Sequence, residues 1–242
     1  MSLDNDKALP WRRMALESVA IILSILLAFA IDATWDEFKE RNREEAFLIS
    51  LLSDFQEARS RIDQSASRHK TFVDMANELL QFHDAKAAYV DPESLAAKLG
   101  AVFFDWEVLY LPSGSRDALF ASDDIEIISN EKLRAMLASW PSTLADAAED
   151  DLWIADDVMN NMAPYLNGKI RVRNVARMTG SFAADYIPRI ESVDYDVLWT
   201  DPMFDNLVSF RILNESYALN ENKRLAETVD EIIQIIEKEL GR

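Results

Sequence analysis

The side chains that could support acid–base or metal chemistry are mostly carboxylates. Asp and Glu number 43, His number two, and Cys is absent. Thiolate catalysis, disulfides and zinc sites built from Cys or several His are therefore excluded. Paired carboxylates can hydrolyse glycosides, and the acidic runs 149–151 and 156–157 could also suggest a calcium site. The runs lack the EF-hand spacing with its central Gly and fall in an expected helix, so we expect a solvated acidic face.

The two histidines lie too far apart to share a metal ion or a proton. His69 and His83 would be about 21 Å apart along a helix. Both fall on the apolar stripe of an expected helix, so we interpret each as a core histidine whose ring is satisfied or partly exposed. The sequence has no Gly-rich phosphate loop, Ser-His-Asp order or HExxH motif. We therefore predict a protein that is not an enzyme and has no catalytic residues, no cofactor and no metal.

A base-only segment interrupts the acidic chain. Four bases and no acid lie between residues 158 and 184: Lys169, Arg171, Arg173 and Arg177. They could contact lipid phosphates or an acidic partner, or they could pair with the chain's own acidic helices. Range 169–175 alternates apolar and basic residues, which gives the one strand-like signal in the sequence.

An apolar run near the N-terminus predicts one membrane span. Met14 to Ile31 carries a single charged residue, and two tryptophans flank the run about 36 Å apart as helix. The expected membrane anchors are Trp11, Arg12, Arg13, Glu17 and Trp35. Glu17 would either snorkel to the headgroups or mark a polar partner. The bases before the run place residues 1–13 in the cytoplasm, residues 14–34 in the membrane and residues 35–242 outside.

A cleaved signal peptide is the alternative interpretation of the apolar run. Residues 28–30 read Ala-Phe-Ala, which fits a cleavage site after Ala30. Against cleavage, helical character continues without Gly or Pro beyond the site. Asp32 and Asp36 share a helix face with Trp35, which suits either a docking face for another membrane protein or an aromatic belt with polar stops.

Two long helices with alternating apolar stripes are expected at opposite ends of the chain. The first covers residues 37–83 and the second residues 202–240, and neither contains an internal Gly or a Pro beyond the first turn. The first stripe comprises Leu48, Leu51, Phe55, Ala58, Ile62, Ser65, His69, Phe72, Ala76, Leu79 and His83. The second comprises Val208, Ile212, Glu215, Leu219, Asn222, Ala226, Val229, Ile233, Ile236 and Leu240. Since each stripe needs an apolar partner, we predict that the helices pack antiparallel as a stalk, with Glu215 and Asn222 fixing the register.

Shorter helices are expected between the two long ones. Asp91 is a predicted N-cap, and Ser115 and Ser129 are further candidates. Pro141 should kink or separate the helices on either side of it. The predicted fold is mainly α: one N-terminal transmembrane helix continues into a long helix, which joins an antiparallel helical bundle or coiled-coil stalk with at most one short β element.

Two stretches carry a resemblance to a known group of proteins. Residues 24–55 read SILLAFAIDATWDEFKERNREEAFLISLLSDF, and residues 112–140 read PSGSRDALFASDDIEIISNEKLRAMLASW. Both resemble segments of a family of uncharacterised bacterial single-span membrane proteins. Residues 122–124 read Ser-Asp-Asp where that family often has Ser-Gly. The resemblance implies the topology described above and no particular activity.

The net charge of the chain argues against one further class of function. A formal net charge of −18 argues against binding nucleic acid. We therefore expect a membrane-anchored accessory or scaffold protein of the bacterial inner membrane, facing the periplasm and binding another membrane protein. A homo-oligomer also fits. The alternatives are an extracytoplasmic sensor that works through a partner and a carboxylate-based hydrolase.

Overall fold

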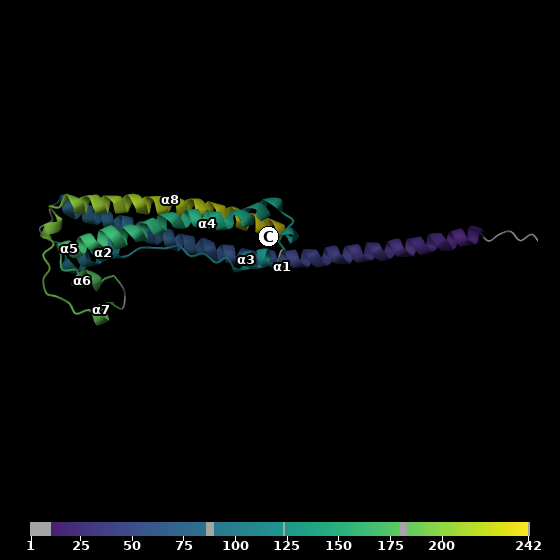
Figure 1. Ribbon diagram of the computed structural model, residues 1–242, viewed down its shortest axis with the longest axis horizontal. Helices are drawn as coiled ribbons and strands as arrows, with labels where there is room; N and C mark the ends of the chain where they lie inside the picture. The colour runs from purple at the N-terminus through teal and green to yellow at the C-terminus, as the bar shows by residue number, and fades with distance from the viewer. Residues whose placement is uncertain (1–10, 86–89, 123, 180–182, 242) are drawn as a thin grey trace, which may run out of the picture.

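The computed structural model describes residues 11–85, 90–122, 124–179 and 183–241, and helices account for most of them. No strand is present within these ranges, so the protein is mainly α, as the sequence predicts. The bundle is elongated, and one helix projects far beyond it (Figure 1).

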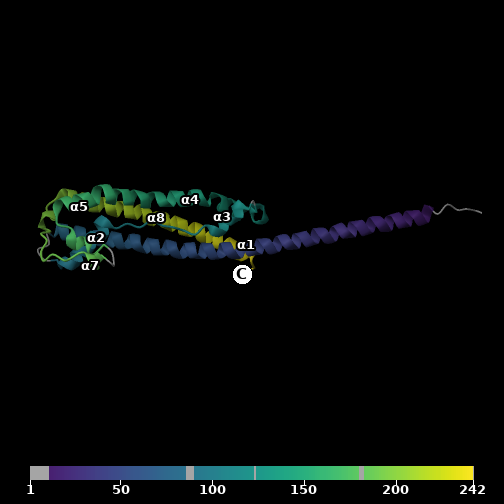
Figure 2. The same cartoon turned by 60° about the horizontal axis from the view of Figure 1, so that its bottom comes forward.

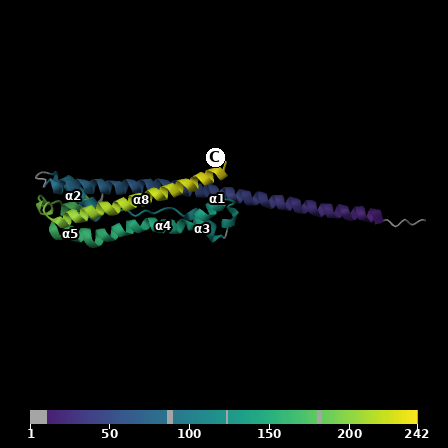
Figure 3. The same ribbon diagram turned by 90° about the horizontal axis from the view of Figure 1, so that it is seen from above.

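Two long helices pair antiparallel, as predicted. α1 (Trp11–Asp84) has 74 residues, and α8 (Pro202–Glu239) has 38 residues. Arg59 Nε lies 2.8 Å from Asp230 Oδ1, and Asn222 Nδ2 donates to Ser65 Oγ at 3.1 Å, so rising numbers on α1 meet falling numbers on α8. Figure 3 shows the two helices lying along each other up to the C-terminus.

A third long helical run completes the bundle. α4 (Glu131–Asp157) continues through a π-helical turn, η2 (Val158–Met162), into α5 (Ala163–Lys169). It is antiparallel to α8, because Asn130 Nδ2 donates to Glu239 Oε1 at one end and the Tyr165 hydroxyl donates to Asp201 Oδ2 at the other. The wider π turn precedes Pro164, which cannot donate a backbone hydrogen bond.

Pro141 does not separate two helices, so that part of the expectation is wrong. α4 passes through Pro141 without a break. Proline leaves the carbonyl of the residue four positions earlier without its helical donor. Here that carbonyl belongs to Leu137, and the Nε of Arg116 donates to it at 3.0 Å. A side chain from α3 (Gly114–Ala121) thus replaces the missing backbone bond.

Short elements connect the long helices. They are α2 (Pro92–Phe104), α3 (Gly114–Ala121), η1 (Ile125–Ile127), α6 (Arg173–Ala176), α7 (Ala183–Tyr186) and η3 (Asp196–Leu198). The expected strand at 169–175 is wrong: Lys169 ends α5, and α6 begins at Arg173. The alternation there reflects buried Ile170 and Val175 on a short turn-and-helix segment.

The predicted helix caps are partly confirmed. Asp91 accepts from Ser94 N and caps α2. Ser129 and Ser115 are not caps: α4 is capped by Asn130, and α3 begins at Gly114. Both serines instead bind α1, because Ser129 donates its N–H and its hydroxyl to Glu44, while the N–H of Ser115 donates to Asp54. The two carboxylates hold the connecting segments against α1.

The apolar core consists of two clusters separated along the bundle. One gathers α2, α5 and the start of α8 around Phe103 and Phe204, and the other gathers α3, the start of α4 and the end of α8 around Trp140. The predicted stripe of α1 is buried except His83, which is partly exposed. The predicted stripe of α8 is half right: residues 208, 215, 222, 229 and 236 are buried, but their partners are 211, 218, 225 and 232, each one position before the predicted one.

The N-terminal part of α1 lies outside the bundle. Figure 2 shows it extending past the C-terminus without a neighbouring element. Among the described residues, α1 is the one helix that is long and apolar enough to cross a membrane. None of its most apolar segment is buried against the rest of the protein. Leu240, near the C-terminus, lies close to Glu44 and Leu48 of α1. The chain therefore returns to the end of the bundle from which the apolar helix leaves.

Candidate functional site

Four ionisable side chains meet in the centre of the bundle, between the two apolar clusters. His69 comes from α1, Asp151 from α4, and Arg211 and Glu215 from α8, and each is at most 2% exposed. His69 Nδ1 lies 2.5 Å from Glu215 Oε2, and His69 Nε2 lies 3.2 Å from Asp151 Oδ1. Arg211 Nε lies 2.7 Å from Glu215 Oε1. We call these four residues the ionic layer.

The connection between α2 and α3 closes the ionic layer. The carbonyl of Asp105 accepts from Arg211 at 2.8 Å, and the N–H of Leu109 donates to Asp151 Oδ2 at 2.9 Å. The Arg211 guanidinium also lies 5.0 Å from the ring centroid of Phe72, within cation–π range. Burial raises the pKa of Glu107 beside the layer, against the lowering effect of Arg68.

Protonated His69 balances the charge of the ionic layer. Burial alone would lower the imidazole pKa, but hydrogen bonds and charges from Asp151 and Glu215 raise it to about 9. The ring therefore carries a proton at neutral pH, and two cations face two anions. A substrate has no access to these fully buried carboxylates, so they do not form a glycosidase pair. The layer instead fixes how α1, α4 and α8 align, as polar core residues do in coiled coils.

Two of the four residues of the ionic layer were predicted to lie on buried stripes, but the layer itself was not predicted. His69 and Glu215 were placed on apolar stripes, whereas Asp151 was expected in the solvated acidic face and is in fact buried. Its position could have been found from its spacing, because Ala147, Ile154 and Val158 share its buried side of the helix. Arg211 was missed because the predicted stripe ran through the apolar Ile212.

Exposed aromatic side chains gather on the outside of α4 and α8. Trp153 is 67% exposed, Phe210 60% and Tyr217 56%. Trp153 and Tyr217 line a shared depression, and Phe210 lies two turns along the same face of α8 from Tyr217. We call these three residues the aromatic face. Large apolar side chains grouped on a surface mark contact sites more often than scattered ones do.

Carboxylates lie at the Trp153 end of the aromatic face. Asp150 lines the same depression as Trp153. Burial raises the pKa of Asp150, and the charges of Glu221, Asp151 and Glu149 raise it further. The local potential is therefore negative, so this face favours a cationic partner.

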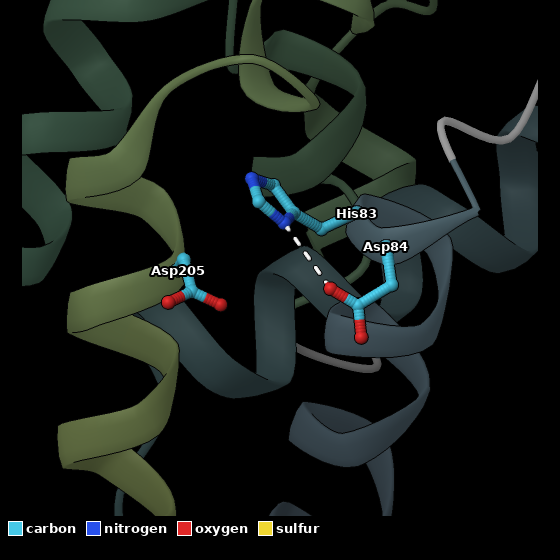
Figure 4. A group of neighbouring side chains, drawn as sticks. All are labelled: His83, Asp84 and Asp205. Carbon is cyan, nitrogen blue, oxygen red and sulfur yellow. Dashed lines mark ion pairs between the residues drawn. The ribbon is translucent and has the colours of Figure 1, made fainter.

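One group of possible metal ligands lies where α1 ends and α8 begins. Ligand atoms of His83, Asp84 and Asp205 lie within 4.8 Å of one another, and this is the one such group within the described residues. Figure 4 shows both carboxylates beside the imidazole, and His83 Nδ1 lies 3.8 Å from Asp84 Oδ1. The Asp84 side chain is 80% exposed, and the His83 ring stacks on Phe204. Packing accounts for the ring position, and three such residues would give a divalent cation an open, solvated site.

The base-only segment is largely bonded within the protein. Lys169 Nζ lies 2.8 Å from Asp201 Oδ2, and Arg171 donates to the carbonyl of Ser192 at 3.0 Å. Arg177 donates to the carbonyls of Ala184 and Ile187. Arg173 is exposed. These contacts favour the structural interpretation for Lys169, Arg171 and Arg177 over a lipid-binding patch.

The predicted membrane anchors lie on the projecting part of α1. Trp11, Glu17 and Trp35 are exposed, and the side chains of Arg12 and Arg13 lie outside the part that the structure describes. Trp35 stacks on Phe38, with Lys39 Nζ 5.7 Å from its ring centroid.

The proposed juxtamembrane contacts lie on the same projecting part. Asp32 and Asp36 are also exposed, and Asp36 lies 3.5 Å from Lys39. The structure brings none of these residues to the ionic layer or the aromatic face.

Comparison of the chain with protein-family models, with curated proteins and with solved structures gives no match. The functional argument therefore depends on the geometry alone.

Proposed function

We propose that the protein is a membrane-anchored helical scaffold whose aromatic face binds a basic, amphipathic segment of a partner protein at the membrane. The observation that carries this proposal is the aromatic face itself: Trp153, Phe210 and Tyr217 stand exposed on neighbouring helices, α4 and α8. Trp and Tyr are the residue types that most often dominate binding energy at interfaces.

Charge selects the kind of partner. Asp150 lies beside Trp153 and Tyr217, and the charges of Glu149 and Glu221 act on it, so a second copy would bring like charges together. A partner helix with Lys or Arg beside apolar residues would pair with the carboxylates and cover the rings. Cation–π contacts with Trp153 and Tyr217 would add to this attraction.

The long helix α1 supports the scaffold part of the proposal. The same uninterrupted helix contains the apolar segment and one wall of the bundle. The bundle would therefore be held at a fixed distance from the lipid, with its ionic layer preventing slippage of the helices. We further propose that the membrane is the bacterial inner membrane and that the bundle faces the periplasm, in line with the basic N-terminus and the resemblance of residues 24–55.

Single cysteines test the topology, because the chain has none of its own. Ser2→Cys and Ser142→Cys are labelled in intact cells with a membrane-impermeant maleimide. We expect labelling at position 142 without lysis and at position 2 only after lysis. Labelling of both before lysis, or the reverse pattern, contradicts the proposed orientation.

Site-specific photo-crosslinking tests the aromatic face. A benzophenone amino acid replaces Trp153 in one strain and Lys70 in a control strain, because the Lys70 side chain is similarly exposed, at 68%, on α1. We expect one discrete adduct, with a protein other than this chain, from position 153 and none from position 70. Asp150→Lys should abolish this adduct. A dimer adduct, or equal adducts from both positions, contradicts the proposal.

A further inference from the structure

A cavity of about 210 Å³ lies at the end of the bundle away from the apolar part of α1. Its walls come from the start of α2, from α6 and from the segment 189–195. Figure 1 shows α2 and α6 close together at that end. The volume is below the roughly 300–1,000 Å³ of pockets for drug-sized ligands, so only a small molecule fits.

Two arginines at this cavity have no carboxylate partner within the described part of the chain. Arg177 and Arg189 both line the cavity. Arg177 donates from Nη1 to two backbone carbonyls, and Arg189 is exposed. In a chain with 43 acids and 25 Lys and Arg, two guanidinium groups beside one cavity without an ion pair are unexpected. A carboxylate is the group that guanidinium recognises best, through two parallel hydrogen bonds.

A buried tyrosine forms part of the same wall. Tyr195 lines the cavity and is 9% exposed, and its hydroxyl has no hydrogen-bond partner among the described residues. A buried polar group without a partner is destabilising, and native proteins rarely keep one unless a ligand, ion or water completes it.

Side chains of the base-only segment hold one wall of the cavity, the segment 189–195, by hydrogen bonds. The Asn174 side chain donates to the carbonyl of Ile190 at 2.9 Å and accepts from its N–H at 3.0 Å. Arg171 donates to the carbonyl of Ser192. These bonds hold the segment 189–195 in place and make the cavity a property of the folded protein.

The other residues that line the cavity balance the positive charge of the two arginines. Glu93 and Glu191 also line the cavity, and Ala96, Met178 and Val193 supply apolar surface. Two cations, two anions and an apolar wall suit a ligand that carries both charges and a short apolar part.

We propose that this cavity binds a small zwitterion of amino-acid size, with its carboxylate toward Arg177 and Arg189 and its ammonium group toward Glu93 and Glu191. The proposal does not depend on the scaffold function, because the cavity and the aromatic face share no residue. It gives the bundle a ligand-sensing end as well as a partner-binding side.

Titration of the full chain in detergent tests the site. The twenty common L-amino acids are screened one by one by thermal shift at about 5 mM, a concentration at which even millimolar binding is seen. The best one is then compared by calorimetry with its N-acetyl form and its amide. We expect at least one amino acid to bind, and each blocked form to bind at least about tenfold more weakly, because it loses one charged contact. No shift with any amino acid, or equal binding of a blocked form, overturns the proposal.

Three variants separate a binding role from a structural one. Arg189→Gln should weaken binding about tenfold without changing the unfolding midpoint, because the guanidinium has no hydrogen bond or ion pair with another described residue. Tyr195→Phe should weaken binding severalfold while stability stays equal or rises, because an unpartnered hydroxyl is removed. Arg173→Gln is the control: it is exposed on α6 outside the lining, and binding should be unchanged. If Arg189→Gln binds as well as Arg173→Gln, the assignment is wrong.

Discussion

Raising the pH above 6.5 should weaken the folded bundle through His69. The ionic layer holds the imidazole pKa at about 9, against 6.5 for the free ring. Burial opposes this increase, but Asp151 and Glu215 outweigh it. The unfolded chain releases the proton near pH 6.5, whereas the folded chain keeps it until about pH 9. This contribution to stability is therefore complete below pH 6.5, falls between pH 6.5 and about 9, and is absent above.

The expected magnitude follows from the two pKa values. Each pKa unit is about 1.36 kcal/mol, so a pKa near 9 in place of 6.5 gives about 3 kcal/mol. Guanidinium unfolding of the full chain in detergent, followed by circular dichroism between pH 6 and pH 9.5, measures the loss. Imidazole nitrogen NMR of chain labelled at His, with His83→Gln to leave one signal, measures the pKa of His69 directly.

Two substitutions on α8 test whether Glu215 raises the pKa of His69. Glu215→Gln should lower the pKa of His69 and flatten the pH dependence, because it removes one of the two carboxylates at the ring. Glu227→Gln, an exposed glutamate on the same helix, should leave both unchanged. A His69 ring that loses its proton at or below pH 6.5 would refute the reasoning.

Three further outcomes are expected. If the apolar helix is a retained anchor, the intact mass of the mature protein includes residues 14–34, whereas a chain beginning at Ile31 shows cleavage. Arg59→Cys with Asp230→Cys should cross-link within one chain through a short bismaleimide, since the native side chains meet at 2.8 Å; cross-links only between chains would mean a different pairing. Trp140→Ala should cost about 3–5 kcal/mol of unfolding free energy, because the indole is 1% exposed, and a loss below about 1 kcal/mol would contradict the packing.

The long helices were predictable because their stripes depend on local spacing. The stripe of α1 was found almost residue by residue, since that helix presents one face to its neighbours. α8 packs against both α1 and α4, which widens its buried side. Arg211 rather than Ile212 is buried where the carbonyl of Asp105, from the connection between α2 and α3, accepts from its guanidinium, and no local pattern contains that information.

The features that depend on distant partners were not predictable in the same way. Pro141 stays within a helix, and the distant Arg116 donates to the carbonyl of Leu137 that the proline leaves without its helical donor. In the sequence, Asp151 cannot be told from the acidic residues next to it. In the structure it differs from them because His69 of α1 lies beside it. The aromatic face was also missed, because exposure of Trp153 is set by which side of α4 the rest of the bundle covers.

Quantitative co-purification from detergent-solubilised membranes tests the central claim most directly. The full chain is compared with the double variant Trp153→Ser, Tyr217→Ser and with the control Lys70→Ser. The proteins that co-purify with each are quantified by mass spectrometry with stable-isotope labelling. We predict one membrane partner near stoichiometric amounts with the wild type and the control. The double variant, which should fold normally because both rings are more than half exposed, should lose that partner at least tenfold, the loss expected when interface aromatics are truncated. Equal recovery with all three chains, or no stoichiometric partner with the wild type, would contradict a scaffold that binds through its aromatic face.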